Sequence, residues 1–182
     1  MRVPSTEAEG PGRRYAVWVQ GCTLACPGCC NPEMFAPRGG ELIDVAALVE
    51  EIAATPGIEG LSILGGEPLQ QAAPVALLAA EVRARGLTVM LYTGYTVDEI
   101  TSAEGRALLA ACDLVVDGRY VREQPETRRR WIGSANQRLH FLSARYRADD
   151  PRFSAANTVE IRLRRGRVDI NGWPGGANKV RP

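Results

Sequence analysis

Four short apolar segments alternate with amphipathic helical segments over the first two thirds of the chain, and this alternation most restricts the fold. The apolar segments are residues 14–21 (RYAVWVQG), 60–64 (GLSIL), 87–92 (LTVMLY) and 113–118 (DLVVDG). Their length and β-branched or aromatic content are typical of buried strands. Parallel strands need a crossover between them, usually a helix, so the pattern predicts an α/β fold with a helix-covered parallel sheet. Four such strands form either an open sheet or an incomplete barrel.

The helices between these strands are predicted from capping residues and apolar periodicity. Asp44 is placed as the N-cap of the first helix, and Pro74 is placed at the first position of the second. Thr96 and Glu99 have the spacing of a capping box, so a third helix is expected to begin at Val97. Gly105 is expected to break that third helix into two pieces.

The two ends of the chain give weaker signals. Residues 1–13 are polar and rich in turn formers, so we expect a flexible N-terminal segment. Residues 137–142 (QRLHFL) are compatible with a strand, and residues 159–164 alternate apolar with polar side chains. Gly166 follows this alternation and precedes RVDI, which predicts a C-terminal β-hairpin.

Composition limits the class of protein. With 182 residues, of which 45% are hydrophobic, residues 1–182 are expected to form one domain. The net charge is +1 and the basic residues are dispersed, so neither a nucleic acid nor a membrane partner is expected. No segment approaches the roughly 20 apolar residues of a membrane span, and we expect a cytoplasmic protein.

Four of the five cysteines lie within nine residues, directly after the first predicted strand. Cys22, Cys26 and Cys29 have the spacing C-x-x-x-C-x-x-C, and Cys30 follows at once. In a reducing compartment such a cluster indicates a metal site rather than disulfides. Three thiolates on a 4Fe-4S cluster leave one iron without a protein ligand, which is a place for a substrate to bind.

A structural zinc site is the alternative interpretation of these cysteines. Zinc in such sites takes four ligands in a closed tetrahedron. The fourth ligand is not evident, because Cys30 adjoins Cys29, Cys112 is distant in sequence, and His140 is the only histidine. Cys112 is more simply interpreted as a buried core residue, and His140 as a structural histidine. The zinc interpretation and unligated cysteines both stay open at this point.

Two further glycine-containing turns follow predicted strands. Gly65, Gly66, Glu67 and Pro68 come directly after the second strand, and Thr93 and Gly94 come after the third. Because the carboxyl ends of parallel strands meet at one edge of the sheet, these turns and the cysteine loop are expected to form one site. Glycine allows close backbone approach, and Glu67 or a backbone carbonyl can accept from an amine.

In combination, these motifs resemble the radical S-adenosylmethionine (SAM) superfamily. The resemblance rests on Cys22, Cys26 and Cys29 followed downstream by Gly65, Gly66 and Glu67. It implies an incomplete parallel (βα) barrel, a 4Fe-4S cluster held by the three cysteines, and SAM bound to the open iron. The Gly-Gly-Glu turn is then expected at the methionyl amino group, and Pro68, Thr93 and Gly94 are candidate contacts to the cofactor.

Later motifs narrow the resemblance to the activating enzymes of glycyl radical enzymes, especially the small activators of anaerobic ribonucleotide reductase. They are LYTGYTVDEI, DLVVDGRY and RWIGSANQRL, and the resemblance extends from about Tyr15 to Trp173. It implies a glycyl radical enzyme as partner and a flavodoxin or ferredoxin as electron donor. Cys30 departs from the pattern, because many relatives have an aromatic residue there beside the adenine.

The implied reaction is reductive cleavage of SAM to methionine and a deoxyadenosyl radical, which abstracts hydrogen from a backbone glycine. No acid–base residue is required, so no catalytic side chain is assigned. One alternative is a radical SAM enzyme that modifies a peptide or a small metabolite. The other is a non-catalytic zinc or electron-transfer module, which leaves the Gly-Gly-Glu-Pro turn unexplained.

Overall fold

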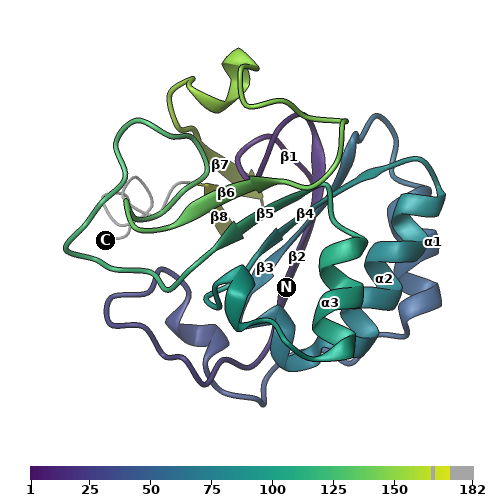
Figure 1. Cartoon of the computed structure of the whole chain (residues 1–182). Coiled ribbons are helices and arrows are strands. Elements are labelled where there is room, and N and C mark those ends of the chain that lie inside the picture. Colours follow the sequence, from purple (N-terminus) through teal and green to yellow (C-terminus); the bar gives the residue numbers. More distant parts are fainter. Residues whose placement is uncertain (165–166, 173–182) are drawn as a thin grey trace.

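The computed structural model describes residues 1–164 and 167–172, and it is built around a six-stranded sheet with the order β1-β2-β3-β4-β5-β6 (Figure 1). The strands are β1 (Arg2–Thr6), β2 (Arg14–Val19), β3 (Gly60–Gly65), β4 (Thr88–Tyr92), β5 (Leu114–Asp117) and β6 (Arg138–Phe141). The four central strands β2 to β5 are parallel. They are the four strands predicted from the apolar segments, so a mixed α/β fold with a mostly parallel sheet is confirmed.

Both edge strands are antiparallel to their neighbours. β6 pairs with β5, which confirms a strand within residues 137–142. β1 pairs with β2 from Arg2 opposite Val17 to Thr6 opposite Arg14. The structure therefore differs from the expectation of a flexible segment at residues 1–13, because residues 2–6 form a strand. This strand is held by main-chain hydrogen bonds to β2, and its side-chain pattern does not indicate a strand.

Three helices cover one face of the sheet, and this layer contains the larger core (Figure 1). They are α1 (Val45–Ala53), α2 (Ala72–Ala84) and α3 (Ala103–Ala110). The Asp44 side chain caps α1 by accepting from Ala47 N–H, as predicted. Strand residues with odd numbers, such as Tyr15, Ile63 and Leu91, face these helices and are fully buried.

Two helix predictions are wrong in detail. α2 begins at Ala72, so Pro74 is its third residue, where its missing N–H is still not needed. Gly105 does not break a helix: the capping box of Thr96 and Glu99 starts only the short turn η3 (Val97–Glu99). α3 begins afterwards with Ser102 as its N-cap, whose hydroxyl accepts from Gly105 N–H at 3.0 Å.

On the helix-free face of the sheet, Met90, Leu114 and Val116 pack in a second core with side chains from residues 131–153, namely Trp131, Ile132, Tyr146 and Phe153. The predicted C-terminal β-hairpin forms a separate two-stranded sheet. The hairpin pairs β7 (Val159–Arg164) with β8 (Arg167–Gly172) in antiparallel register. Gly166, predicted at its turn, lies outside the described residues. Within residues 1–164 and 167–172, no helix has the length and apolar character needed to span a membrane.

Candidate functional site

A cavity of about 480 Å³ lies at the carboxyl edge of the parallel strands and extends along the helix-free face. The loops that follow β2, β3, β4 and β5 all contribute to its wall. Its lining from these loops includes Cys22, Cys26, Cys29, Cys30, Gly65, Gly66, Glu67, Thr93, Gly94, Gly118 and Tyr120. The structure therefore brings together the three predicted cluster cysteines and five of the six predicted cofactor residues. A volume in this range suits a nucleoside-sized ligand.

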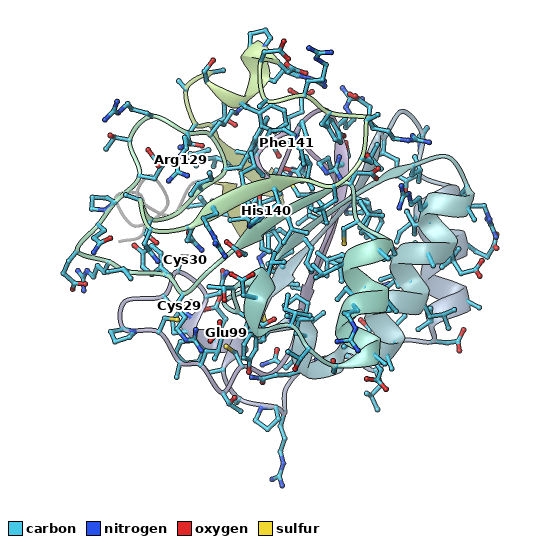
Figure 2. The ribbon with its side chains drawn as sticks, viewed as in Figure 1. Cys29, Cys30, Glu99, Arg129, His140 and Phe141 are labelled. Carbon is cyan, nitrogen blue, oxygen red and sulfur yellow. The ribbon has the colours of Figure 1, made fainter. Side chains whose placement is uncertain are left out.

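The cysteine loop extends from the end of β2, and Figure 2 shows Cys29 and Cys30 on the side of the sheet edge away from the helices. Backbone hydrogen bonds tie its two ends: Gly21 N–H donates to Met34 O at 2.9 Å, and Cys22 N–H donates to Phe35 O at 3.1 Å. Within the loop, Cys29 N–H donates to Cys26 O at 3.1 Å. Cys22, Cys26 and Cys29 are all partly exposed rather than packed in the core. The loop thus presents its thiols to the cavity.

The thiols of this loop differ in acidity. The hydrogen bond from the Cys30 thiol lowers the pKa of Cys29 to about 6, against the opposing effect of burial. Burial raises the pKa of Cys26. Donation to Cys29, together with burial, raises the pKa of Cys30 well above its ordinary value. Since the thiolate is the metal ligand, Cys29 is more ready to coordinate than Cys26 or Cys30.

The Gly-Gly-Glu turn is packed against the start of the cysteine loop. Glu67 N–H donates to Gly21 O at 2.8 Å. A Cβ on Gly66 would lie 2.3 Å from Gly21 O, and one on Gly65 would lie 2.6 Å from Trp18 Cα. Gly65 also has a φ of +102°, in the region that favours glycine. Both glycines are therefore required for the turn and the cysteine loop to approach this closely.

The Glu67 side chain connects this turn to the end of β4. Its carboxylate accepts from Thr93 Oγ1–H at 2.8 Å, Gly94 N–H at 2.8 Å and Leu69 N–H at 2.9 Å, and the residue is 1% exposed. Burial raises the pKa of this carboxyl group. The carboxylate is thus committed within the protein, which leaves the backbone carbonyls of the turn as acceptors for a ligand amine. Pro68 is buried at the start of η2 (Pro68–Gln71) rather than lining the cavity.

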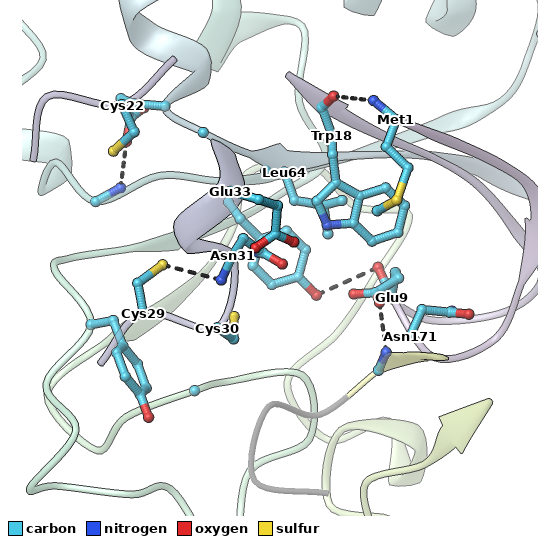
Figure 3. Close-up of a pocket in the computed structure, with 18 of the residues that line it drawn as sticks. Met1, Glu9, Trp18, Cys22, Cys29, Cys30, Asn31, Glu33, Leu64 and Asn171 are labelled. Carbon is cyan, nitrogen blue, oxygen red and sulfur yellow. Dashed lines mark hydrogen bonds between the residues drawn. The ribbon is translucent and has the colours of Figure 1, made fainter. Parts of the chain in front are cut away.

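Several residues of the cavity were not predicted from the sequence. Trp18 and Tyr92 lie on the strand faces opposite the helices, and Trp131 and Tyr120 come from the irregular segment after β5. Figure 3 shows Trp18 and Glu9 across the cavity from Cys29. In a strand successive side chains point to opposite faces, so the sequence of β2 puts Trp18 on the face opposite Tyr15 and Val17, and this alternation is a signal for Trp18.

Two predicted structural residues are found in structural roles. Cys112 is 1% exposed, its thiol donates to Leu108 O at 3.1 Å, and burial raises its pKa to about 12. His140 lies on β6 with its Nε2 3.1 Å from an oxygen of the buried Asp117 (Figure 2). Neither residue lines the cavity.

The chemistry of the donor set fits a 4Fe-4S cluster better than a single metal ion. In the described part of the chain, no three His, Cys, Asp or Glu side chains lie close enough together to hold one ion. A zinc ion needs its four ligands at about 2.0–2.3 Å from one centre. An iron–sulfur cluster takes each thiolate on a different iron, so three cysteines spaced along one loop suffice.

Comparisons with known proteins agree with this donor set. A family model described as "4Fe-4S single cluster domain" matches residues 8–140. The chain is 32% identical over 145 residues to the anaerobic ribonucleoside-triphosphate reductase-activating protein of Haemophilus influenzae, covering 75% of this chain and 93% of the relative. The protein of the same name from Enterobacteria phage T4 is 35% identical over 143 residues, with 75% and 88% covered. The one from Escherichia coli strain K12 is 30% identical over 147 residues, with 76% and 95% covered.

Proposed function

Because this chain belongs to the 4Fe-4S single cluster domain family and to the anaerobic ribonucleoside-triphosphate reductase-activating proteins, we propose that it activates such a reductase by radical SAM chemistry. The enzyme cleaves SAM reductively and generates a glycyl radical on the reductase. The observation that carries the proposal is that Cys22, Cys26, Cys29 and the turn at Gly65–Glu67 line one cavity.

Cys22, Cys26 and Cys29 would hold the cluster. When bound, the reduced cluster would supply one electron to the sulfonium of SAM, and the chemistry that follows would be cleavage to methionine and a deoxyadenosyl radical able to remove a hydrogen atom from a backbone glycine. The chain's own contribution is to hold these partners in line and to exclude water, which lowers the entropic cost of the encounter. The four parallel strands β2 to β5 around the cavity support the finer prediction of an incomplete (βα) barrel of the radical SAM type.

The turn at Gly65 and Gly66 is assigned to the methionyl amino group of SAM. Its backbone is already in close contact with the cysteine loop, so an amine held there lies beside the cluster. Glu67, Thr93 and Gly94 keep the turn in place through the hydrogen bonds to the Glu67 carboxylate. Gly94 and Tyr120 are assigned to the nucleoside, since both line the cavity at this end.

The electron donor is assigned to the flavodoxin or ferredoxin class, and the reaction to the cytoplasm, where such donors are kept reduced. Cluster reduction needs an external electron, because the reaction consumes one for each SAM cleaved. The partner that supplies the glycine is the reductase named in the relatives.

The proposal is tested by anaerobic reconstitution of the purified chain. We expect about four irons and four sulfides per chain, deoxyadenosine after addition of SAM and dithionite, and a glycyl radical signal on the reductase of the same organism after mixing. Cys26→Ala should lose the cluster and the deoxyadenosine together. A reconstituted protein that makes deoxyadenosine but gives no radical on the reductase would instead indicate a peptide or metabolite as substrate.

A further inference from the structure

Glu9 lies on the connection between β1 and β2, at a different end of the cavity from the cysteine loop. Thr6 pairs with Arg14, so this connection starts at the amino end of β2, whereas the cysteines follow its carboxyl end. The Glu9 backbone oxygen accepts from Ser62 Oγ at 2.6 Å and from Tyr92 Oη at 3.4 Å. Both partners lie on the helix-free face, so Glu9 is held against the cavity floor.

The Glu9 carboxylate faces the cavity and keeps acceptor capacity for a ligand (Figure 3). Gly172 N–H donates to its Oε1 at 2.8 Å, and the side chain of Asn171, which is 7% exposed, also hydrogen-bonds to this carboxyl group. A carboxylate offers about four acceptor positions, so these neighbours do not exhaust it. Within residues 1–164 and 167–172, no Lys, Arg or His forms an ion pair with Glu9.

The proposed reaction indicates which ligand would lie against the cavity floor at Glu9. Under the proposed function, the cysteine end of the cavity would hold the cluster and the amino group of SAM, which would leave the other end for the group that gives up the hydrogen atom. The hydrogen donor must therefore lie farther from the cysteines than SAM does. Glu9, Tyr92 and Trp131 are among the residues that line the cavity outside the cysteine loop.

We propose that Glu9 is a positioning residue for the partner's peptide, whose main-chain N–H beside the target glycine donates to the Glu9 carboxylate. The inference rests on the proposed function. Glycine has no side chain to bind, so its recognition must use main-chain groups. Tyr92, whose hydroxyl donates to the Glu9 main-chain oxygen at 3.4 Å, adds an aromatic side chain beside this acceptor.

Glu9→Gln is the sharpest variant, because the amide keeps one oxygen to accept from Gly172 N–H and replaces the other oxygen with an NH₂ donor. A peptide N–H would then face another donor. The probe is a synthetic peptide of about ten residues, comparable to an extended strand, copied from the radical-bearing glycine loop of the reductase. Its binding to the reconstituted enzyme with SAM is measured by anaerobic calorimetry. Glu81→Gln, exposed on α2, is the matched control.

We expect Glu9→Gln to weaken peptide binding about tenfold, consistent with the loss of one hydrogen bond. Deoxyadenosine formation without the partner should stay within about twofold of the wild type, which also shows that the variant folds and holds its cofactors. Glu9→Asp should restore part of the peptide affinity.

Two results would overturn the assignment. One is unchanged peptide binding in Glu9→Gln. The other is a parallel loss of partner-free deoxyadenosine formation, which would place Glu9 on SAM or in the fold instead. A wild-type enzyme that cleaves no SAM would overturn the proposed function itself, so the two failures are distinguishable.

Discussion

The Thr93 hydroxyl donates to the Glu67 carboxylate at 2.8 Å, and this bond joins the ends of two neighbouring parallel strands. Gly94 N–H donates to the other carboxylate oxygen. Glu67, which the Gly-Gly-Glu motif places beside a cofactor, thus binds other parts of the protein through its carboxylate. It holds the turn after β3 at a set distance from the turn after β4.

Removing the Glu67 carboxylate should destabilise the protein. Glu67→Ala leaves the Thr93 hydroxyl and the Gly94 and Leu69 amides without their buried acceptor, and we expect a loss of about 2–4 kcal/mol in the free energy of unfolding. Urea denaturation of the variant measures it, with Glu81→Ala as the exposed control. If SAM affinity falls while stability is unchanged, Glu67 contacts the ligand rather than bracing the turn.

The close approach at Gly66 should tolerate no side chain. Gly66→Ala sets a methyl 2.3 Å from Gly21 O, a backbone atom that cannot rotate away, so the turn and the cysteine loop must separate. We expect SAM cleavage to fall by at least about 100-fold, as misplacement of a reacting group commonly does. Gly39→Ala is the control, because it has open space around it and only the backbone penalty of its φ of +101°. Equal activity of the two variants would contradict the packing argument.

Alanine variants of the five cysteines should distinguish three cluster ligands from two cysteines that do not bind the cluster. Cys22→Ala, Cys26→Ala and Cys29→Ala should each lose most of the iron and sulfide after reconstitution, whereas Cys112→Ala should retain them. Cys30→Ala should also retain a cluster, because its thiol is the hydrogen-bond donor to Cys29 and resists deprotonation. Iron and sulfide analysis with electron paramagnetic resonance checks each variant. Loss of the cluster in Cys30→Ala would point to a fourth cysteine ligand.

Glu9 should make stability depend on pH. Burial raises its pKa to about 7, so the folded chain keeps this proton after the unfolded chain has lost it. The free energy of unfolding should therefore fall as the pH rises from about 4.5 to 7, by roughly 1–3 kcal/mol in total. Glu9→Gln removes this fall, so the variant should gain stability over the wild type between about pH 5 and pH 8. A difference that stays constant over that range would refute the raised pKa.

Part of the fold of this protein can be predicted from its sequence. Apolar segments of strand length, helical periodicity and the Asp44 cap act over a few neighbouring residues, so the parallel core could be predicted. The cysteine motif and the Gly-Gly-Glu motif each extend over a few neighbouring residues, so they were sufficient to locate the cysteine loop and the glycine turn. Helix boundaries were predicted less well: the capping box at Thr96 starts a 3-10 turn, and Ser102 is the N-cap of the helix that follows.

The sequence by itself determined the four parallel strands, the sheet edge where the loops meet, and the three thiols available to a cluster, because each depends on short-range pattern. Only the tertiary structure decided that residues 2–6 form a strand, that Glu67 is consumed by Thr93 and Gly94, and that Glu9 faces the cavity. These depend on partners up to 163 residues apart, as for Glu9 and Gly172. Hydrogen bonds of that range leave no periodicity in the chain, since neither partner constrains its own neighbours.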